Sequence, residues 1–173
     1  RSGDSRFGWV HAMTATPRRR PKIGDIVEIK TPKGLAYAQF THKHASPPRF
    51  GSLIRVLPGC FESRPERFDW LVQEPEQFAI FFPLGAAVNR QIVEIVGHEN
   101  VPERWVEFPV FKLGNPSSAT GHVGDNWSLW DGEREVHVGR LTPEQQAYPM
   151  LQVVNDTMLI HLIVTGWRSS DVT

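Results

Sequence analysis

The chain has 173 residues, of which 40% are hydrophobic and 22% are charged, as in a single globular domain with a hydrophobic core. Its 19 lysines and arginines balance its 19 aspartates and glutamates, so the zero net charge gives no overall attraction for nucleic acid or an anionic membrane. One cysteine, Cys60, excludes an internal disulfide framework and a multi-cysteine zinc site. It lies in no nucleophile motif, which favours a bystander thiol.

The sequence predicts neither a membrane-spanning helix nor a secretory signal. No apolar run reaches the roughly 18 residues of a spanning helix, and no basic-then-apolar signal opens the chain. We therefore expect a cytoplasmic protein that does not associate with membranes. Met13 is typical of a native start, so residues 1–12 are either an added leader or an upstream extension. Residues 1–21 form an N-terminal arm whose basic run is either solvated or a contact for phosphates or an acidic partner.

The opening of the domain carries the clearest core signal. Apolar runs at 26–29 and 35–40 flank the tetrapeptide TPKG at 31–34. Proline presets φ in such a β-turn and glycine takes a positive φ on its far side, so we predict a hairpin. A third apolar run at 52–57 is expected to pair onto the hairpin and to begin an antiparallel sheet or small barrel.

Two histidines end the second strand. His42 and His44 are two residues apart, which places both imidazoles on one face of a strand, a geometry that metal sites use. Two ligands make an incomplete site, and neither a nearby cysteine nor an HxxE motif completes it. The simpler interpretation is a pair at the entry to a loop. We predict no metal site and no cofactor.

The middle of the chain consists of short elements. Residues 62–76 predict a loop that leads into a short strand, and the apolar run 77–82 predicts a buried strand. Residues 84–88 then cross to another strand at 92–96. Residues 114–125 are small and polar and predict a loop.

The pair Asp131-Gly132 between alternating segments predicts a two-residue type I′ hairpin. In that register Trp130 faces Glu133. One side of the hairpin is then the core face, which carries Trp127, Leu129, Val136 and Val138. The other side is polar, and it carries Ser128, Trp130, Glu133, Glu135 and His137.

An indole among carboxylates is either covered by the rest of the chain or offered to a partner, and aromatic residues are enriched at interface hot spots. We therefore predict a partner-binding site made of Trp130, Glu133, Glu135 and His137. The alternative is that Trp130 packs beneath the 114–125 loop.

Two helices are expected near the C-terminus. Thr142, Pro143 and Gln145 form an N-cap, a first helical residue and a capping box, and they predict a helix of about two turns. Asn155, Asp156 and Thr157 offer capping residues, and residues 157–165 predict a helix that ends at Gly166, with a strand as the alternative because of its β-branched residues. The residues expected to face the core are Leu159, Leu162 and Ile163. Residues 169–173 form a tail that we expect to fray.

Together these patterns predict a mainly β, α+β protein with one domain at residues 22–168. Its architecture is a strongly twisted antiparallel sheet or an open SH3-like barrel with one or two short C-terminal helices. No P-loop, dinucleotide turn, G-x-S-x-G elbow or H-E-x-x-H motif is present, and we assign no catalytic residue.

The opening KIGDIVEIKTPKGLAYAQF resembles the first hairpin of the immunity protein 26 family of bacterial polymorphic toxin systems. The strand FAIFFPL and the segment IVEIVGHENVPERWVEFPVFKLG are similar to that family's later strands, with its V-x-G turn and P-x-F element. The resemblance spans about residues 22–114, and its motifs are short and rich in glycine and proline. It implies a non-catalytic protein that neutralises a cognate toxin by covering the toxin's active site or blocking its activation.

If the resemblance holds, the acidic side of the second hairpin is expected to imitate the phosphates of a nuclease substrate. Two other classes stay open. An SH3-like module binding peptide or nucleic acid is favoured by a basic groove, for which the cations are Arg18, Arg19, Arg20, Lys43, Arg49 and Arg55. Nucleic acid is the less expected partner because the chain is neutral. An enzyme needs a pocket where His42, His44 and His98 converge with Glu99.

Overall fold

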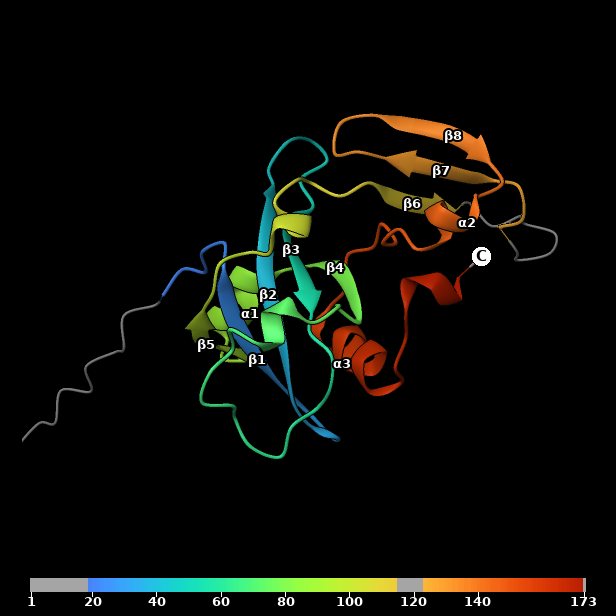
Figure 1. The fold of residues 1–173 in the computed structure, drawn as a ribbon. Coiled ribbons are helices and arrows are strands. Elements are labelled where there is room, and N and C mark those ends of the chain that lie inside the picture. Colours follow the sequence, from blue (N-terminus) through green and yellow to red (C-terminus); the bar gives the residue numbers. More distant parts are fainter. Residues whose placement is uncertain (1–18, 115–122, 173) are drawn as a thin grey trace, which may run out of the picture.

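The computed structural model describes residues 19–114 and 123–172, and it confirms a mainly β, α+β fold (Figure 1). An open antiparallel sheet of order β4-β3-β2-β1-β5 contains β1 (Asp25–Thr31), β2 (Gly34–His44), β3 (Gly51–Val56), β4 (Phe78–Phe82) and β5 (Val93–His98). A second antiparallel sheet contains β6 (Phe111–Gly114), β7 (Trp127–Trp130) and β8 (Glu135–Gly139). The helices are α1 (Leu84–Asn89), α2 (Pro143–Gln146) and α3 (Asp156–Val164), with short 3₁₀ turns at Leu71–Gln73, Glu103–Trp105 and Ser169–Asp171.

The first hairpin forms as its turn chemistry predicts. Thr31 pairs with Gly34 across the turn, and Gly34 has a φ of +119°. A Cβ at this position would lie 2.6 Å from the carbonyl oxygen of Phe61. Phe61 lies this close because its backbone N–H donates to the carbonyl of Leu35 and its carbonyl accepts from Leu35 N. Glycine is therefore required at position 34 both for its backbone conformation and for this close approach.

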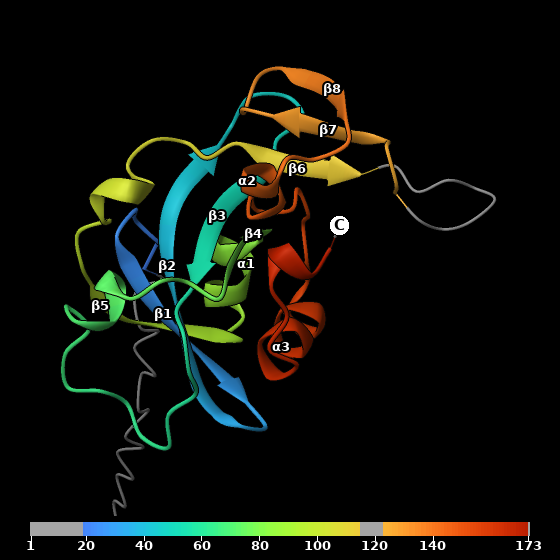
Figure 2. The ribbon, with the colours of Figure 1, turned by 45° about the vertical axis from the view of Figure 1, so that its right-hand side comes forward.

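One face of the five-stranded sheet is apolar and is covered by α1 and α3 (Figure 2). Val27 and Ile29 of β1 lie on this face, as their alternation predicts. The helices contribute the buried side chains Leu84, Ala87, Leu159, Leu162 and Ile163. This core is continuous across all five strands, and it makes the sheet a rigid platform for its other face.

The other face is divided. At one end the 3₁₀ turn Leu71–Gln73 and Phe68 pack on Ile26 and Tyr37. At the other end the second sheet packs on Leu53 and Phe81 through an aromatic cluster, which consists of Phe50, Phe81, Trp105, Phe108, Phe111 and Trp130. Between the two ends lie buried polar side chains, including Gln39 and Arg55.

A short extended segment, residues 149–154, joins the two sheets. It forms a parallel bridge with Lys112 of β6 through Met150 and another with Phe81 of β4 through Val153. The carbonyl of Pro149 accepts from Lys112 N at 2.9 Å, and the carbonyl of Gln152 accepts from Phe81 N at 3.1 Å. The segment therefore occupies the outer edges of β4 and β6, which would otherwise present unpaired backbone groups.

The C-terminal helices agree with the predicted caps. The capping box of Thr142 and Gln145 is present, although α2 is a single turn and shorter than expected. Residues 156–164 form a helix, which settles the choice between helix and strand, and the Asn155 side chain accepts from Met158 N. Gly166 ends the helix region with a φ of +69°.

Residues 84–88 cross from β4 to β5 as expected, and they do so as the helix α1. Two other expectations are wrong in detail. Residues 62–76 lead into a 3₁₀ turn and not a short strand. The tail at 169–173 does not fray over its described part, because Ser169 is buried and a 3₁₀ turn forms.

No helix in the described part of the chain combines the length and apolar character needed to cross a bilayer.

Candidate functional site

The turn between β7 and β8 is longer than the predicted two residues. Trp130 pairs with Glu135, so four residues, 131–134, connect the strands. The Asp131 carboxylate accepts from the backbone N–H of Glu133 at 2.9 Å and of Arg134 at 2.8 Å. These two N–H groups hold the pKa of Asp131 below its usual range, so the charged carboxylate pins the turn at neutral pH.

This turn is also tied to the five-stranded sheet. The carbonyl of Gly132 accepts from Nε2 of His44 at 2.9 Å. Gly132 has a φ of +105°, and a Cβ there would lie 2.9 Å from the Phe108 ring. A glycine is needed here because the backbone approaches the aromatic cluster so closely.

Trp130 is buried in the aromatic cluster, with 7% of its surface exposed. Its ring centroid lies 4.9 Å from that of His44 and 5.1 Å from that of Phe50, both at steep angles. The predicted partner-binding site requires an exposed Trp130, but the indole is buried and is not available to a partner. Its role in this geometry is to lock the second sheet onto the first.

The three other predicted site residues lie on the surface. Glu133, Glu135 and His137 are exposed, and so is Val136 between the last two, at 58%. β8 is the last strand of its sheet, and it pairs only with β7 among the described residues. The structure therefore brings an acidic turn and an exposed edge strand together. The buried Trp130 side chain packs this hairpin against the first sheet.

The histidines that an enzyme would need have separate partners. His42 Nε2 lies 3.1 Å from the carbonyl of Val106, and His44 Nε2 bonds to the carbonyl of Gly132. Both rings contact Phe108, so the pair does share one face. Because Nε2 of each ring donates to a carbonyl, neither Nε2 can bind a metal. Burial holds the pKa of His42 below its usual range.

His98 belongs to another cluster. Its Nδ1 lies 2.9 Å from Oδ1 of the fully buried Asp25, which also accepts from Arg19 at 3.2 Å. Glu99 contributes its backbone carbonyl, which accepts from the Gln39 amide at 2.9 Å. Within residues 19–114 and 123–172, no three His, Cys, Asp or Glu side chains are placed to hold a metal ion.

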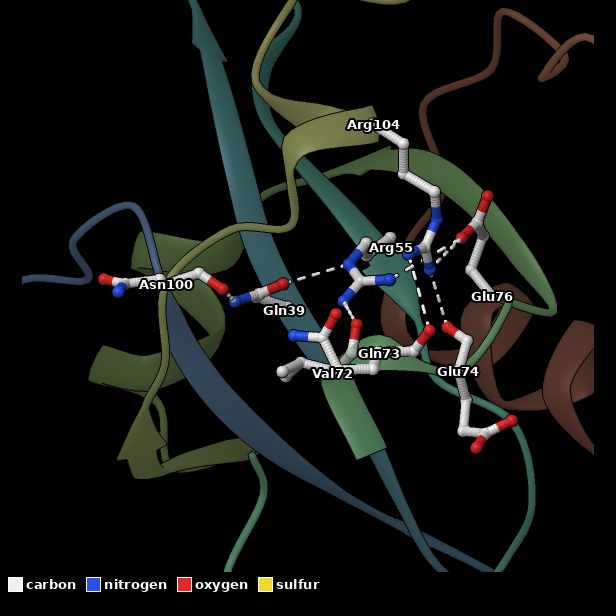
Figure 3. Close-up of polar contacts among 8 residues, drawn as sticks. All are labelled: Gln39, Arg55, Val72, Gln73, Glu74, Glu76, Asn100 and Arg104. Atoms are coloured by element: carbon white, nitrogen blue, oxygen red, sulfur yellow. Dashed lines mark hydrogen bonds and ion pairs between the residues drawn. The ribbon is translucent and has the colours of Figure 1, made fainter. Parts of the chain in front are cut away.

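Arg55, which the sequence analysis assigned to a basic groove, lies instead at the centre of the divided face (Figure 3). Arg55 of β3 is fully buried, and it donates from Nε to Gln39 Oε1 at 2.9 Å and from Nη2 to the carbonyl of Val72. Its Nη1 lies 3.6 Å from Oε2 of Glu76. Burial lowers the pKa of Arg55 to about 10, against the attraction of Glu76. Arg55 cannot contribute to a basic nucleic-acid groove because it is inside the protein.

A second arginine reinforces this network from the surface. Arg104 donates to the carbonyl of Glu74 at 2.7 Å and approaches Glu76 Oε2 at 3.4 Å (Figure 3). Two guanidinium groups therefore share one carboxylate, and they close the loop 73–76 over β3. One signal of this network is present in the sequence: Arg55 stands within the apolar strand SLIRVL, where a charged side chain is expected to need buried partners.

Glu28 of β1 is the centre of a further polar cluster. Arg64 binds both of its carboxylate oxygens, at 2.7 and 3.1 Å, and the Tyr37 hydroxyl donates to Oε2 at 3.0 Å. The hydrogen bonds from Arg64 hold the pKa of Glu28 below its ordinary value of 4.5, although burial opposes this. Burial and the bond to Glu28 raise the pKa of Tyr37 to about 12.

The Glu28 cluster predicts a specific acid sensitivity. A carboxyl whose pKa is lower in the folded state stabilises the fold above its unfolded pKa, and this stabilisation is lost as the pH falls through the folded pKa. Arg64→Gln raises the folded pKa of Glu28 toward its unfolded value. We therefore expect this variant to be less stable than the wild type at pH 7 and to lose less of its stability as the pH falls toward 2.5. Urea midpoints measured from pH 7 down to pH 2.5 test this.

The matched control for Arg64→Gln is Arg67→Gln, which removes the exposed ion pair with Asp69. It should leave the pH profile unchanged. Parallel profiles for the wild type and Arg64→Gln would contradict this role of Glu28.

Lys112 of β6 is a second fully buried cation. Its Nζ donates to three carbonyls, those of Gln146 at 2.7 Å, Ser169 at 2.8 Å and Val172 at 2.6 Å. It lies 5.4 Å from the centroid of the Trp127 ring. Burial lowers the pKa of Lys112 while the charge of Asp171 opposes this. One ammonium therefore ties α2 and the C-terminal segment to the second sheet.

Comparison with protein-family models, with curated proteins and with solved structures finds no match to this chain.

Proposed function

We propose that this chain is a non-catalytic binding protein of the immunity type, which acts in the cytoplasm and neutralises a cognate toxin by direct contact. The observation that carries the proposal is the exposed edge strand β8 with its acidic turn, held in place by a buried aromatic anchor. The contact residues are Glu133, Glu135 and His137.

The geometry suits binding because the surface is ordered before a partner arrives. Asp131 fixes the turn, and the His44 bond to Gly132 fixes the turn to the main sheet. A preorganised surface loses little conformational entropy on association. Carboxylates at the rim attract a basic partner, such as the substrate groove of a nuclease, and speed the encounter.

The test is to express the gene immediately upstream of this one in a bacterial host, with and without this chain. We expect growth arrest from the upstream product alone, growth in the presence of this chain, and a complex of the two purified proteins. An upstream product that neither arrests growth nor binds would contradict the proposal.

The surface is tested by the double variant Glu133→Lys, Glu135→Lys. Reversing two rim charges should weaken binding to the toxin at least about tenfold. The control Glu62→Lys, Glu66→Lys makes the same charge change at two exposed positions of the 57–70 loop. Equal losses in both double variants would show that β8 is not the contact surface.

A further inference from the structure

The outer edge of β8 has no partner strand within the described residues, because β8 pairs with β7 on its other side and ends the second sheet. Figure 1 and Figure 2 both place β8 outermost, with β7 and β6 between it and the five-stranded sheet. The edge is therefore accessible from the side that faces away from the rest of the molecule. Backbone N–H and C=O groups along such an edge can pair with another extended chain.

The turn that precedes β8 fixes which backbone groups point outward. Asp131 N donates to the carbonyl of Arg134 at 3.2 Å, so these two residues form a hydrogen-bonded pair of the hairpin. Hydrogen-bonded and non-hydrogen-bonded pairs alternate along an antiparallel ladder, so Val136 is the next residue of β8 that bonds to β7. The backbone groups of Glu135 and His137 therefore point away from β7, toward the free edge.

The side chains along this edge alternate between the two faces of the second sheet. Val136 is 58% exposed, and it lies opposite Leu129 of β7 on one face. Glu135 and His137 point to the other face, and both are exposed. Val136 is thus an apolar side chain left in water between two residues whose backbone groups are free to pair. A strand added at this edge would cover it.

We propose that β8 pairs with β8 of a second copy of this chain, antiparallel and centred on Val136, so that the two second sheets join into one. A two-fold axis makes such an interface use the same patch on both copies. The outward groups of Glu135 in one copy then meet those of His137 in the other, on both sides of the axis. The two Val136 side chains form the non-hydrogen-bonded pair at the axis, where opposite side chains approach most closely.

The charges of β8 complement those of a second β8 in this register. Glu135 of one copy lies directly opposite His137 of the other, and an imidazole N–H can donate to a carboxylate. The two Glu135 carboxylates are only diagonal neighbours, at the larger separation of roughly 7–8 Å. The same strand therefore supplies both halves of a favourable cross-strand pair.

The remaining charges of the turn do not oppose one another in this register. Glu133 of one copy falls opposite Gly139 of the other, and Arg134 falls opposite Val138. The Asp131 carboxylate is already bonded to two N–H groups of its own turn. No two like charges are therefore directly opposite each other along the paired strands.

The neighbouring registers lack this complementarity. Centring the pair on Glu135 places the two Glu135 carboxylates directly opposite each other, which destabilises a sheet. Centring it on His137 opposes the two imidazoles and leaves Glu135 opposite Gly139, without a partner. The register centred on Val136 is the most favourable of these arrangements.

The dimer does not depend on toxin binding, because it needs only the backbone of β8, Val136 and the pair of Glu135 with His137. Pairing over one short strand buries little surface, so we expect a dimer that forms and separates with concentration. A toxin that contacts Glu135 and His137 would have to separate the two copies. That last consequence rests on the proposed function, whereas the dimer itself does not.

The test is sedimentation velocity of the purified full chain as a function of its concentration, for the wild type and for Val136→Lys. The new lysine is exposed in the monomer and leaves the fold intact, but in the dimer two ammonium groups meet at the axis. The matched control is Val106→Lys. Val106 is 65% exposed and directly follows the 3₁₀ turn Glu103–Trp105, away from β8.

A charge swap tests the register. His137→Glu places two carboxylates opposite each other on both sides of the axis, and it should weaken the dimer at least about tenfold. Adding Glu135→Lys to this variant restores opposite charges across the strands, so the double variant should recover the dimer.

We expect the wild type and Val106→Lys to dimerise alike and Val136→Lys to stay monomeric. High chain concentration should slow exchange of the amides of Glu135 and His137, and not of residues 93–98 in β5. A wild type that is monomeric at every concentration, a Val136→Lys dimer as tight as that of the wild type, or no recovery in the double variant would each overturn the proposal. These measurements involve no toxin, so their outcome is separate from that of the proposed function.

Discussion

Replacing Lys112 with methionine is expected to lower the free energy of unfolding by about 3 kcal/mol, the scale of losing charge-assisted bonds to several buried carbonyls. Methionine keeps the length and the apolar stem of lysine but removes the ammonium that binds the carbonyls of Gln146, Ser169 and Val172. Urea unfolding measures the loss. Faster amide exchange in residues 166–172 should show that the C-terminal segment detaches first.

Lys33→Met is the matched control for the Lys112 variant. Lys33 also donates to a backbone carbonyl, that of Val164 at 2.8 Å, but this contact is exposed to solvent. Water replaces the lost donor there, so the expected cost is below about 1 kcal/mol. Equal effects of the two variants would mean that the three buried bonds of Lys112 do not hold the C-terminal segment.

Local sequence chemistry was sufficient to predict elements whose stabilising contacts lie within a few residues. The turn at 31–34, the capping box at Thr142 and the helix cap at Asn155 all form as predicted. In each case the side chain and the backbone group that it serves are at most three residues apart. Nothing distant in the chain had to be known.

The second hairpin shows where this reasoning ends. The Asp-Gly pair predicts a two-residue turn, but the Asp131 carboxylate binds two later N–H groups, and His44 of a distant strand binds Gly132. For residues 128–130 the register moves by two residues, for example from Trp130 opposite Glu133 to Trp130 opposite Glu135. A shift of two keeps these side chains on their predicted faces, whereas a bulge between Trp127 and Ser128 places Trp127 opposite Gly139.

The burial of the two faces was nevertheless predicted wrongly. Trp127 is buried as expected, but Val136 on the same face is 58% exposed, and Trp130 on the supposed polar face is a core residue. Alternation says which side chains share a face, but it does not say which neighbour covers that face. That depends on how the second sheet docks on Phe50 and Phe81, which are distant in the sequence.

Replacing Arg55 with methionine is the change with the largest expected effect, a loss of about 3–5 kcal/mol, the range for breaking a buried charge network. The variant leaves Gln39 Oε1 and the carbonyl of Val72 without their donor inside the sheet. Loop 73–76 also loses the cation beneath Glu76. Urea unfolding at pH 7 measures the loss of stability.

Arg55→Lys separates charge from geometry. Lysine keeps the cation but has no planar fork, so it cannot serve Gln39, Val72 and Glu76 at the angles that a guanidinium provides. We expect it to recover only part of the stability. Full recovery would show that the charge alone matters and that the forked hydrogen bonds do not.

Arg104→Met is the control because this arginine shares Glu76 but lies nearer the surface, with 42% of its side chain exposed. Its loss removes the bonds to the carbonyls of Gln73 and Glu74. It also relieves the repulsion by which Arg104 lowers the pKa of Arg55. The two effects oppose each other, so the expected cost is about 1 kcal/mol or less. If Arg104→Met destabilised the protein as much as Arg55→Met, the loop closure at the surface, and not the buried guanidinium, would hold this face together.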